Sequence, residues 1–250
     1  MCLGLPRFAI VQYAVPMSRR GSVNALDKLQ QQVTACTRCP RLREHCLEVA
    51  RVKRRAYRDW DYWGKPVPAF GDPKARLLLI GLAPAAHGAN RTGRMFTGDS
   101  SGDFLFRALY ETGFASQAEA THRDDGLELQ DVYITASARC APPGNKPTRE
   151  EFAACRPYLV DELQLLSNLR VVIVLGRLAL DSYLTTLLDQ GLIEKRSLYP
   201  FGHAVRHRLP GNLPVLLCCY HPSRQNTQTG RLTPAMFLKV FRQARLLLSR

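Results

Sequence analysis

The side chains best suited to chemistry are the thiols of eight cysteines. Cys36 and Cys39 form a Cys-x-x-Cys pair followed by proline, a spacing at which two thiolates can grip one metal centre. A thioredoxin-like redox pair would follow a strand inside a βαβ unit, whereas a helical pattern precedes this pair. The pair therefore predicts a metal centre, which needs two further soft ligands.

Cys140 and Cys155 are good candidates for the other two ligands. Cys140 follows a strand expected at 132–137, and Cys155 lies on the apolar face of the next predicted helix. Cys46 and His45 compete for the same role. Four thiolates suit either tetrahedral zinc or an iron–sulfur cluster, and spacing alone does not separate the two.

The remaining three cysteines are interpreted as structural thiols. Cys218 and Cys219 are neighbours in a predicted strand, so their side chains face opposite sides and cannot both serve one site. Cys2 stands alone near the start of the chain.

A second chemical feature is the segment 81–102, which holds five glycines together with Arg91 and Arg94. Glycines allow a sharp turn close to a ligand, and arginines suit phosphate. The segment is much longer than the roughly 2 to 6 residues of an ordinary βα loop. It matches neither a Walker loop nor a dinucleotide fingerprint. We expect a binding loop rather than a flexible connector.

These residues must be positioned by alternating strands and helices. Strands are expected at 77–80, 132–137, 171–175 and 215–219, and helices at 103–112, 149–166, 176–188 and from Pro234 to the end. Thr148 with Glu151 forms a capping box, and Thr233 precedes a proline in the first helical position. The pattern predicts an α/β fold with a mostly parallel four-stranded sheet.

Ligands in such folds collect at the carboxyl ends of the strands. Three loops meet there: 81–102, 138–146 and 221–230. Their amides, hydroxyls, arginines and single imidazole suit a polyanion and a heteroaromatic ring. Residues 51–73 mix basic and aromatic side chains without periodicity, which predicts an extended arm with its aromatics packed on the core. Base stacking by one of them is the alternative.

The net charge of the chain favours a polyanionic partner. The 250 residues carry a net charge of +14 and the pI is near 9.8. We expect a 1–21 extension before a single domain at 22–250, with Met17 as an alternative start. No membrane span or convincing signal peptide is visible. The expectation is a cytoplasmic, nucleoid-associated monomer.

Three motifs in order resemble the type b, family 5, uracil-DNA glycosylases of bacteria and archaea. They are 81–85 with 96–102, the run 134–147, and 221–226. The resemblance covers about residues 30–248. It implies a three-layer α/β/α fold and a [4Fe-4S] cluster on Cys36, Cys39, Cys140 and Cys155, which sets Cys46 aside. It also implies an enzyme that flips a deaminated base out of DNA and hydrolyses its N-glycosidic bond.

The resemblance also assigns roles in the reaction. His221 would donate to the departing base, and Asp99 would orient water or stabilise the sugar cation. Asn145 matches a second polar position, and Phe96 matches an aromatic that stacks on the flipped base. Their structural alternatives are a packing histidine, a helix N-cap, a turn asparagine and core packing, respectively.

The base pocket departs from uracil-specific relatives. Leu82 and Ala83 follow Gly81 where such enzymes carry an acidic or amide residue, and Ala136 replaces an asparagine that reads the pyrimidine edge. Discrimination depends on polar groups left unpaired by the wrong base. We therefore expect activity on hypoxanthine, xanthine or etheno-cytosine as well as uracil.

DNA contacts are predicted in two of the loops. Arg91, Arg94, Ser223 and Arg224 would hold phosphates, while Gln225 or Asn226 would fill the gap left by the flipped nucleotide. The rival interpretations are a DNA-binding module with a degenerate site and a redox protein that uses the cluster.

Overall fold

The centre of the molecule is a six-stranded sheet in the order β1-β3-β2-β4-β6-β5. The computed structural model describes residues 19–249. The four inner strands are parallel, as predicted: β2 (Leu77–Gly81), β3 (Val132–Ala136), β4 (Val171–Leu175) and β6 (Val215–Cys219). They are apolar runs buried on both faces, which is typical of parallel sheets.

The prediction of four strands was incomplete. Two antiparallel edge strands of two residues each, β1 (Phe70–Gly71) and β5 (Arg206–His207), flank the parallel core. They were missed because two residues are too few to show an alternating pattern.

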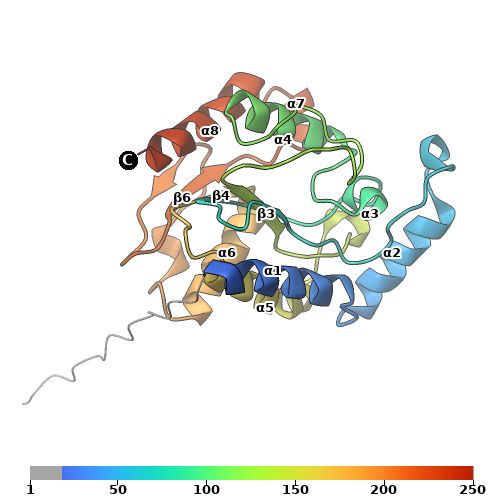
Figure 1. Cartoon of the computed structure of the whole chain (residues 1–250), viewed down its shortest axis with the longest axis horizontal. Helices are drawn as coiled ribbons and strands as arrows, with labels where there is room; N and C mark the ends of the chain where they lie inside the picture. Colours follow the sequence, from blue (N-terminus) through green and yellow to red (C-terminus); the bar gives the residue numbers. More distant parts are fainter. Residues whose placement is uncertain (1–18, 250) are drawn as a thin grey trace, which may run out of the picture.

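Helices cover both faces of the sheet (Figure 1). One face carries α1 (Arg19–Thr34), α5 (Arg149–Leu165) and α6 (Arg177–Asp189), and the other carries α4 (Ser100–Glu111) and α8 (Pro234–Leu248). Alternate residues of β2 enter opposite cores, Leu77 and Leu79 toward α4 and α8, and Leu78 and Ile80 toward α6. The three-layer α/β/α prediction is confirmed.

The capping signals in the sequence correctly mark two helix starts. Thr148 and Glu151 form the reciprocal capping box of α5, and Thr233 caps α8. Helix α2 (Pro40–Val52) was not predicted, although Pro40 in its first position is a start signal. Short elements complete the chain: α3 (Ala89–Thr92), α7 (Arg224–Gln228), η1 (Arg55–Tyr57), η2 (Pro143–Asn145) and η3 (Arg196–Leu198).

The first turn of α1 begins at Arg19, so most of the predicted 1–21 extension, with Cys2 and Met17, lies outside the described residues. Within residues 19–249, no helix combines the length and apolar character needed to cross a membrane. Cys218 and Cys219 enter different cores, as expected for neighbours in a strand.

Candidate active site

The predicted loops begin side by side at the carboxyl edge of the sheet. Gly81 at the end of β2 pairs with the buried Ala136 at the end of β3. Just beyond, Ser137 N–H donates to the Gly81 carbonyl (2.9 Å) and Ala138 N–H to the Leu82 carbonyl (3.0 Å). The register of two parallel strands therefore fixes the starting points of both loops.

Phe96 is held against the end of β2. A Cβ added to Gly81 would lie 2.8 Å from the Phe96 ring, so only glycine admits the ring at this distance. The backbone of Phe96 has φ +54°, which is uncommon for a residue with a side chain, and its carbonyl packs against Gly102, where no Cβ would fit. Strain of this kind is characteristic of functional sites. The ring is half-buried rather than part of the closed core.

His221 approaches Phe96 from the end of β6, two strands away from β2 in the sheet. Their ring centroids lie 6.0 Å apart with the planes tilted by 32°. His221 follows β6 and is held by Asn226, whose Nδ2 donates to the His221 carbonyl (2.9 Å). Burial lowers the pKa of His221 to about 4, so the imidazole is neutral at pH 7 and carries one N–H donor.

A cleft of about 280 Å³ opens beside this pair. Leu82, His221 and Asn226 line it, which brings together predicted residues from two loops. The sequence prediction missed several others, because the β4 loop was not counted among the converging loops. The full lining is Leu82, Leu175, Gly176, Arg177, Leu178, Ala179, Phe201, Tyr220, His221, Asn226 and Arg231. Arg177 and Arg231 bring positive charge to this cleft.

Asp99 caps helix α4 and has a raised pKa. Its Oδ1 caps α4, accepting from the N–H groups of Ser101 (2.9 Å) and Gly102 (3.0 Å). Its Oδ2 packs on Gly88, where an added Cβ would lie 2.0 Å away. Burial raises the pKa of Asp99, opposed by the two backbone bonds and by Arg91. The helix-cap interpretation is thus correct, and the second oxygen is left outside the cap.

Asn145 is positioned differently. It ends η2 with φ +57°, directly after Gly144 at φ +59°, and its side chain is exposed. Among the described residues the Asn145 side chain forms no hydrogen bond. This is the geometry of a turn asparagine.

Arg91 and Arg94 do not agree with their predicted role as phosphate ligands. Both are buried, at 3% and 6% exposure. Arg94 forms a bidentate pair with Asp125 (2.8 and 2.7 Å). Arg91 donates to the carbonyls of His87 (2.9 Å) and Gly98 (2.8 Å). Both guanidinium groups brace the long loop from inside, since a buried charge needs such partners.

The third loop offers exposed groups for DNA. Ser223 caps α7, its Oγ accepting from the N–H of Asn226 (3.4 Å). Arg224 and Gln225 are exposed on the short helix that follows. Asn226, predicted to fill the gap left by a flipped nucleotide, is instead used in part to hold His221.

The four predicted cysteine ligands gather at one corner. Cys39 precedes α2, Cys140 follows β3, and Cys155 lies in α5. The pKa of Cys39 is raised to about 11, first by burial and then by repulsion from Cys155, Cys140, Glu151 and Cys36. Cys46 packs in the same buried cluster as Cys140, and its thiol donates to the Ala141 carbonyl (3.6 Å). Among the described residues, no three Cys, His, Asp or Glu side chains are arranged to hold a single metal ion.

A buried ion pair fixes the chain next to Cys140. Arg139 Nη2 donates to Glu162 Oε2 (2.6 Å), and both side chains are at most 1% exposed. Thr135 donates to the same oxygen (2.7 Å), and Gln30 to the other (3.1 Å). The root of the 138–147 loop is therefore tied to α1 and α5.

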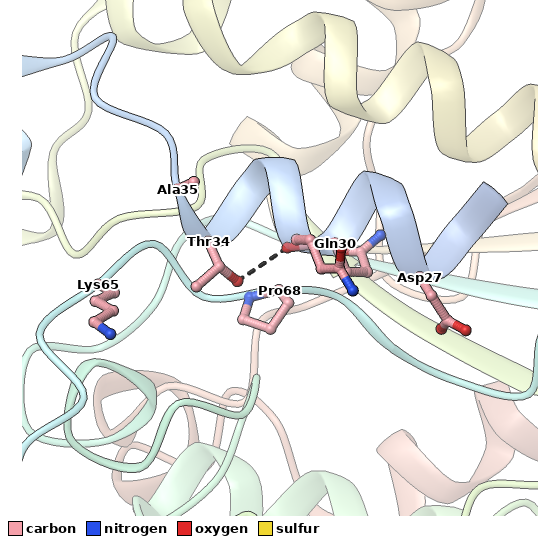
Figure 2. A pocket seen from close by; sticks show the side chains of 7 residues that line it. Asp27, Gln30, Thr34, Ala35, Lys65 and Pro68 are labelled. Atoms are coloured by element: carbon pink, nitrogen blue, oxygen red, sulfur yellow. Dashed lines mark hydrogen bonds between the residues drawn. The ribbon is translucent and has the colours of Figure 1, made fainter. Parts of the chain in front are cut away.

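A second cavity lies elsewhere. It measures about 710 Å³ and lies between α1 and the segment 65–68, where Asp27, Gln30 and Thr34 face Lys65 and Pro68 (Figure 2). None of the predicted catalytic side chains lines it.

Comparison with known proteins gives a consistent result. The model of the "Uracil DNA glycosylase superfamily" matches residues 68–245. A Type-5 uracil-DNA glycosylase of Thermus thermophilus is 52% identical over 217 residues, 87% of this chain and 95% of the relative. Proteins of the same name match from Mycobacterium leprae (46% identity, 91% of this chain, 97% of the relative) and Pyrobaculum aerophilum (42%, 87% and 91%).

Proposed function

Because the chain belongs to the uracil DNA glycosylase superfamily and to its type-5 family, we propose that it removes uracil from DNA by hydrolysing the N-glycosidic bond. The scissile bond is unreachable inside a duplex, so the nucleotide must first be flipped out. The observation that carries the proposal is the pairing of Phe96 with a neutral His221 beside a cleft at the carboxyl edge of the sheet. An aromatic face and a donor are what a flipped pyrimidine requires.

His221 would act on the leaving group. Cleavage of the bond places negative charge on the departing base. A neutral imidazole can donate a hydrogen bond to that charge without being fully protonated, and the low pKa keeps it in that form at pH 7. Phe96 would hold the base by stacking.

Asp99 would act on the sugar side, where positive charge develops. Its capping bonds fix the carboxylate, and the uncapped Oδ2 is the atom that would orient water or stabilise the sugar cation. Asn145 would contribute from an exposed turn, where no hydrogen bond among the described residues fixes its side chain.

We propose the same broad choice of bases as the sequence indicates. Leu82 lines the cleft and Ala136 ends β3, and neither side chain offers a hydrogen bond to a base edge. Uracil, hypoxanthine, xanthine and etheno-cytosine would then be accepted, because neither Leu82 nor Ala136 has a polar group that one of these bases would leave unpaired.

We further propose a [4Fe-4S] cluster held by Cys36, Cys39, Cys140 and Cys155. Cys155, Cys140 and Cys36 all lie close enough to Cys39 for charge on them to raise its pKa, and this proximity of thiols from three separate parts of the chain supports the fit. An iron–sulfur cluster is larger than one ion, so its thiolates stand farther apart than in a single-ion site. When bound, the cluster would supply redox-active iron. The protein residues themselves would tie α2, β3 and α5 together.

Iron content tests this ligand set. Purified wild-type protein should contain about four iron atoms per chain. Cys155→Ser should lose most of the iron, whereas Cys46→Ser should retain it. Iron lost from Cys46→Ser and kept by Cys155→Ser would reassign the fourth ligand.

Base release tests the enzymatic proposal. Matched duplexes carrying one uracil, hypoxanthine, xanthine or etheno-cytosine, with thymine as control, should all release base except the thymine duplex. Binding without release of any base would favour a DNA-binding module with a degenerate site. Release of uracil alone would refute the broad specificity. The same assay on single-stranded DNA, together with light scattering, would test action on both DNA forms and the predicted monomer.

A further inference from the structure

An exposed basic turn lies beside the loop that carries Asp99. It comprises residues 53–58, which follow α2 and contain η1, and we call it the basic turn. Arg54, Arg55 and Arg58 are exposed in it. Among the described residues none of these three arginines forms an ion pair with a carboxylate. Figure 1 shows this part of the chain at the edge of the molecule, beyond the end of α2.

The basic turn forms hydrogen bonds within itself and to the residues that follow it, in spite of its exposure. Lys53 Nζ donates to the Arg58 carbonyl (3.1 Å), which closes the turn. The backbone of Lys53 has φ +56°, an uncommon conformation that such a contact stabilises. The N–H of Arg54 points to the Tyr62 hydroxyl (3.4 Å), which in turn bonds His87 Nδ1 (3.0 Å).

Arg91 anchors the segment to the long loop. Its guanidinium carbon lies 3.9 Å from the ring centroid of Tyr57 and 4.0 Å from that of Trp60. The same guanidinium donates to the carbonyl of Gly98, the residue before Asp99. One buried cation therefore connects Tyr57 of the basic turn and the nearby Trp60 to the catalytic loop through cation–π contacts.

The charge of this region favours an anionic partner. The basic turn contains four basic residues, and the residues that follow it contain only two acidic ones, Asp59 and Asp61. The pKa of His87 is lowered by burial and then by the positive charges of Arg54, Arg91 and His45. The positive potential of the basic turn thus extends to the loop that carries Asp99.

We propose that the basic turn binds the phosphate backbone of DNA next to the flipped nucleotide, through Arg54, Arg55 and Arg58. Their forked guanidinium groups form no ion pair among the described residues, and Arg91 anchors the segment that carries them. The inference rests on the proposed function, in which DNA is the substrate. It assigns to the 53–58 segment the role that the sequence suggested for Arg91 and Arg94.

The test compares two triple variants of equal charge. Arg54→Ala, Arg55→Ala and Arg58→Ala together remove the basic turn's arginines, while Arg196→Ala, Lys239→Ala and Arg242→Ala remove three exposed charges from η3 and α8. Binding to an undamaged duplex is measured over a series of salt concentrations. Single-turnover release is measured on a uracil duplex at saturating protein.

The basic-turn variant should bind at least ~10-fold more weakly, and its slope of log affinity against log salt should be shallower by about 2 to 3. The control triple should change the slope by less than about one. The rate at saturation should stay within about twofold of wild type, since the site is intact. Equal slopes for the two triples would overturn the proposal.

A variant that keeps the charge of the basic turn tests its anchoring by Arg91 separately. Tyr57→Leu with Trp60→Leu removes the Arg91 sandwich and leaves every arginine of the basic turn in place. We expect weaker binding by roughly threefold or more, because the turn loses its preorganisation. Unchanged affinity would show that the anchor plays no part in binding. Failure of wild type to release uracil would refute the glycosylase proposal alone, since the binding arms use undamaged DNA.

Discussion

Two loops that start from neighbouring strand ends differ in how they are held. The 81–102 loop is fixed throughout by buried arginines, and by Gly81, Gly88 and Gly102, whose missing side chains admit Phe96 and Asp99. The 138–147 loop is tied at its root by Arg139 and ends in the exposed Asn145. The shared strand register therefore fixes where the two loops begin. Whether a catalytic group farther along each loop is held in place depends on the contacts within that loop.

The largest effect concerns the root of the 138–147 loop. Glu162→Ala would leave the guanidinium of Arg139 buried without its carboxylate, which costs about 3 to 5 kcal/mol of unfolding free energy. Glu162→Gln keeps an acceptor for Arg139 and Thr135 and should lose less. Urea unfolding followed by circular dichroism measures both. Equal stability of Glu162→Ala and wild type would show that the root is not held by this pair.

The next prediction compares the two candidate catalytic side chains. Asp99→Ala should lower single-turnover uracil release by about 10² or more, equivalent to about 2.7 kcal/mol, because its carboxylate is preorganised. Asn145→Ala should lower it by less than Asp99→Ala, because the Asn145 side chain is exposed and no hydrogen bond among the described residues holds it in place. A greater loss from Asn145→Ala would reverse the comparison and make the exposed loop the main catalytic element.

A pair of glycine substitutions sharpens the same comparison. Gly88→Ala should push the Asp99 carboxylate aside and lower the rate by roughly tenfold, since misplacing a group by about 1 Å can cost up to 10². Gly144→Ala is the matched control in the other loop, where a Cβ meets nothing within 4 Å. Its strain from φ +59° should appear in stability rather than in rate. Similar rates for the two variants would contradict a fixed carboxylate.

The smallest effect is a displacement of the pH profile. Burial raises the pKa of Asp99, so the rate should fall with decreasing pH at a higher pH than an ordinary aspartate near 3.9 would give. His221, with a pKa of about 4, stays neutral above that value and adds no limb near pH 7. Asp99→Asn should be slow and lack the acid limb. A limb retained in that variant would assign it to another group.

Much of the fold could be predicted from the sequence. The apolar runs of the four parallel strands and the caps at Thr148 and Thr233 are local signals, and they gave these elements nearly to the residue. The edge strands and α3 are too short to carry a period. The burial of Arg91 and Arg94 could not be foreseen, because an arginine's sequence neighbours do not show whether Asp125 or two aromatic rings lie opposite it.

The motifs of the site could be predicted from the sequence, but the contacts between their side chains could not. The approach of Phe96 and His221 depends on Gly81 and on tertiary register. Arg177 lines the cleft from the first residue of α6 and Arg231 from the connection between α7 and α8, and no motif marked either position. The cysteine ligands, the breadth of bases and the monomeric state stay predictions.

The most direct test is uracil release by wild type and His221→Ala, with duplex affinity measured on the same preparations. The account predicts release by wild type, a loss of about 10² in the single-turnover rate of the variant, and nearly equal affinities, because the imidazole acts on charge that develops only in the transition state. Wild type that binds DNA without releasing uracil, or a variant as fast as wild type, would contradict it.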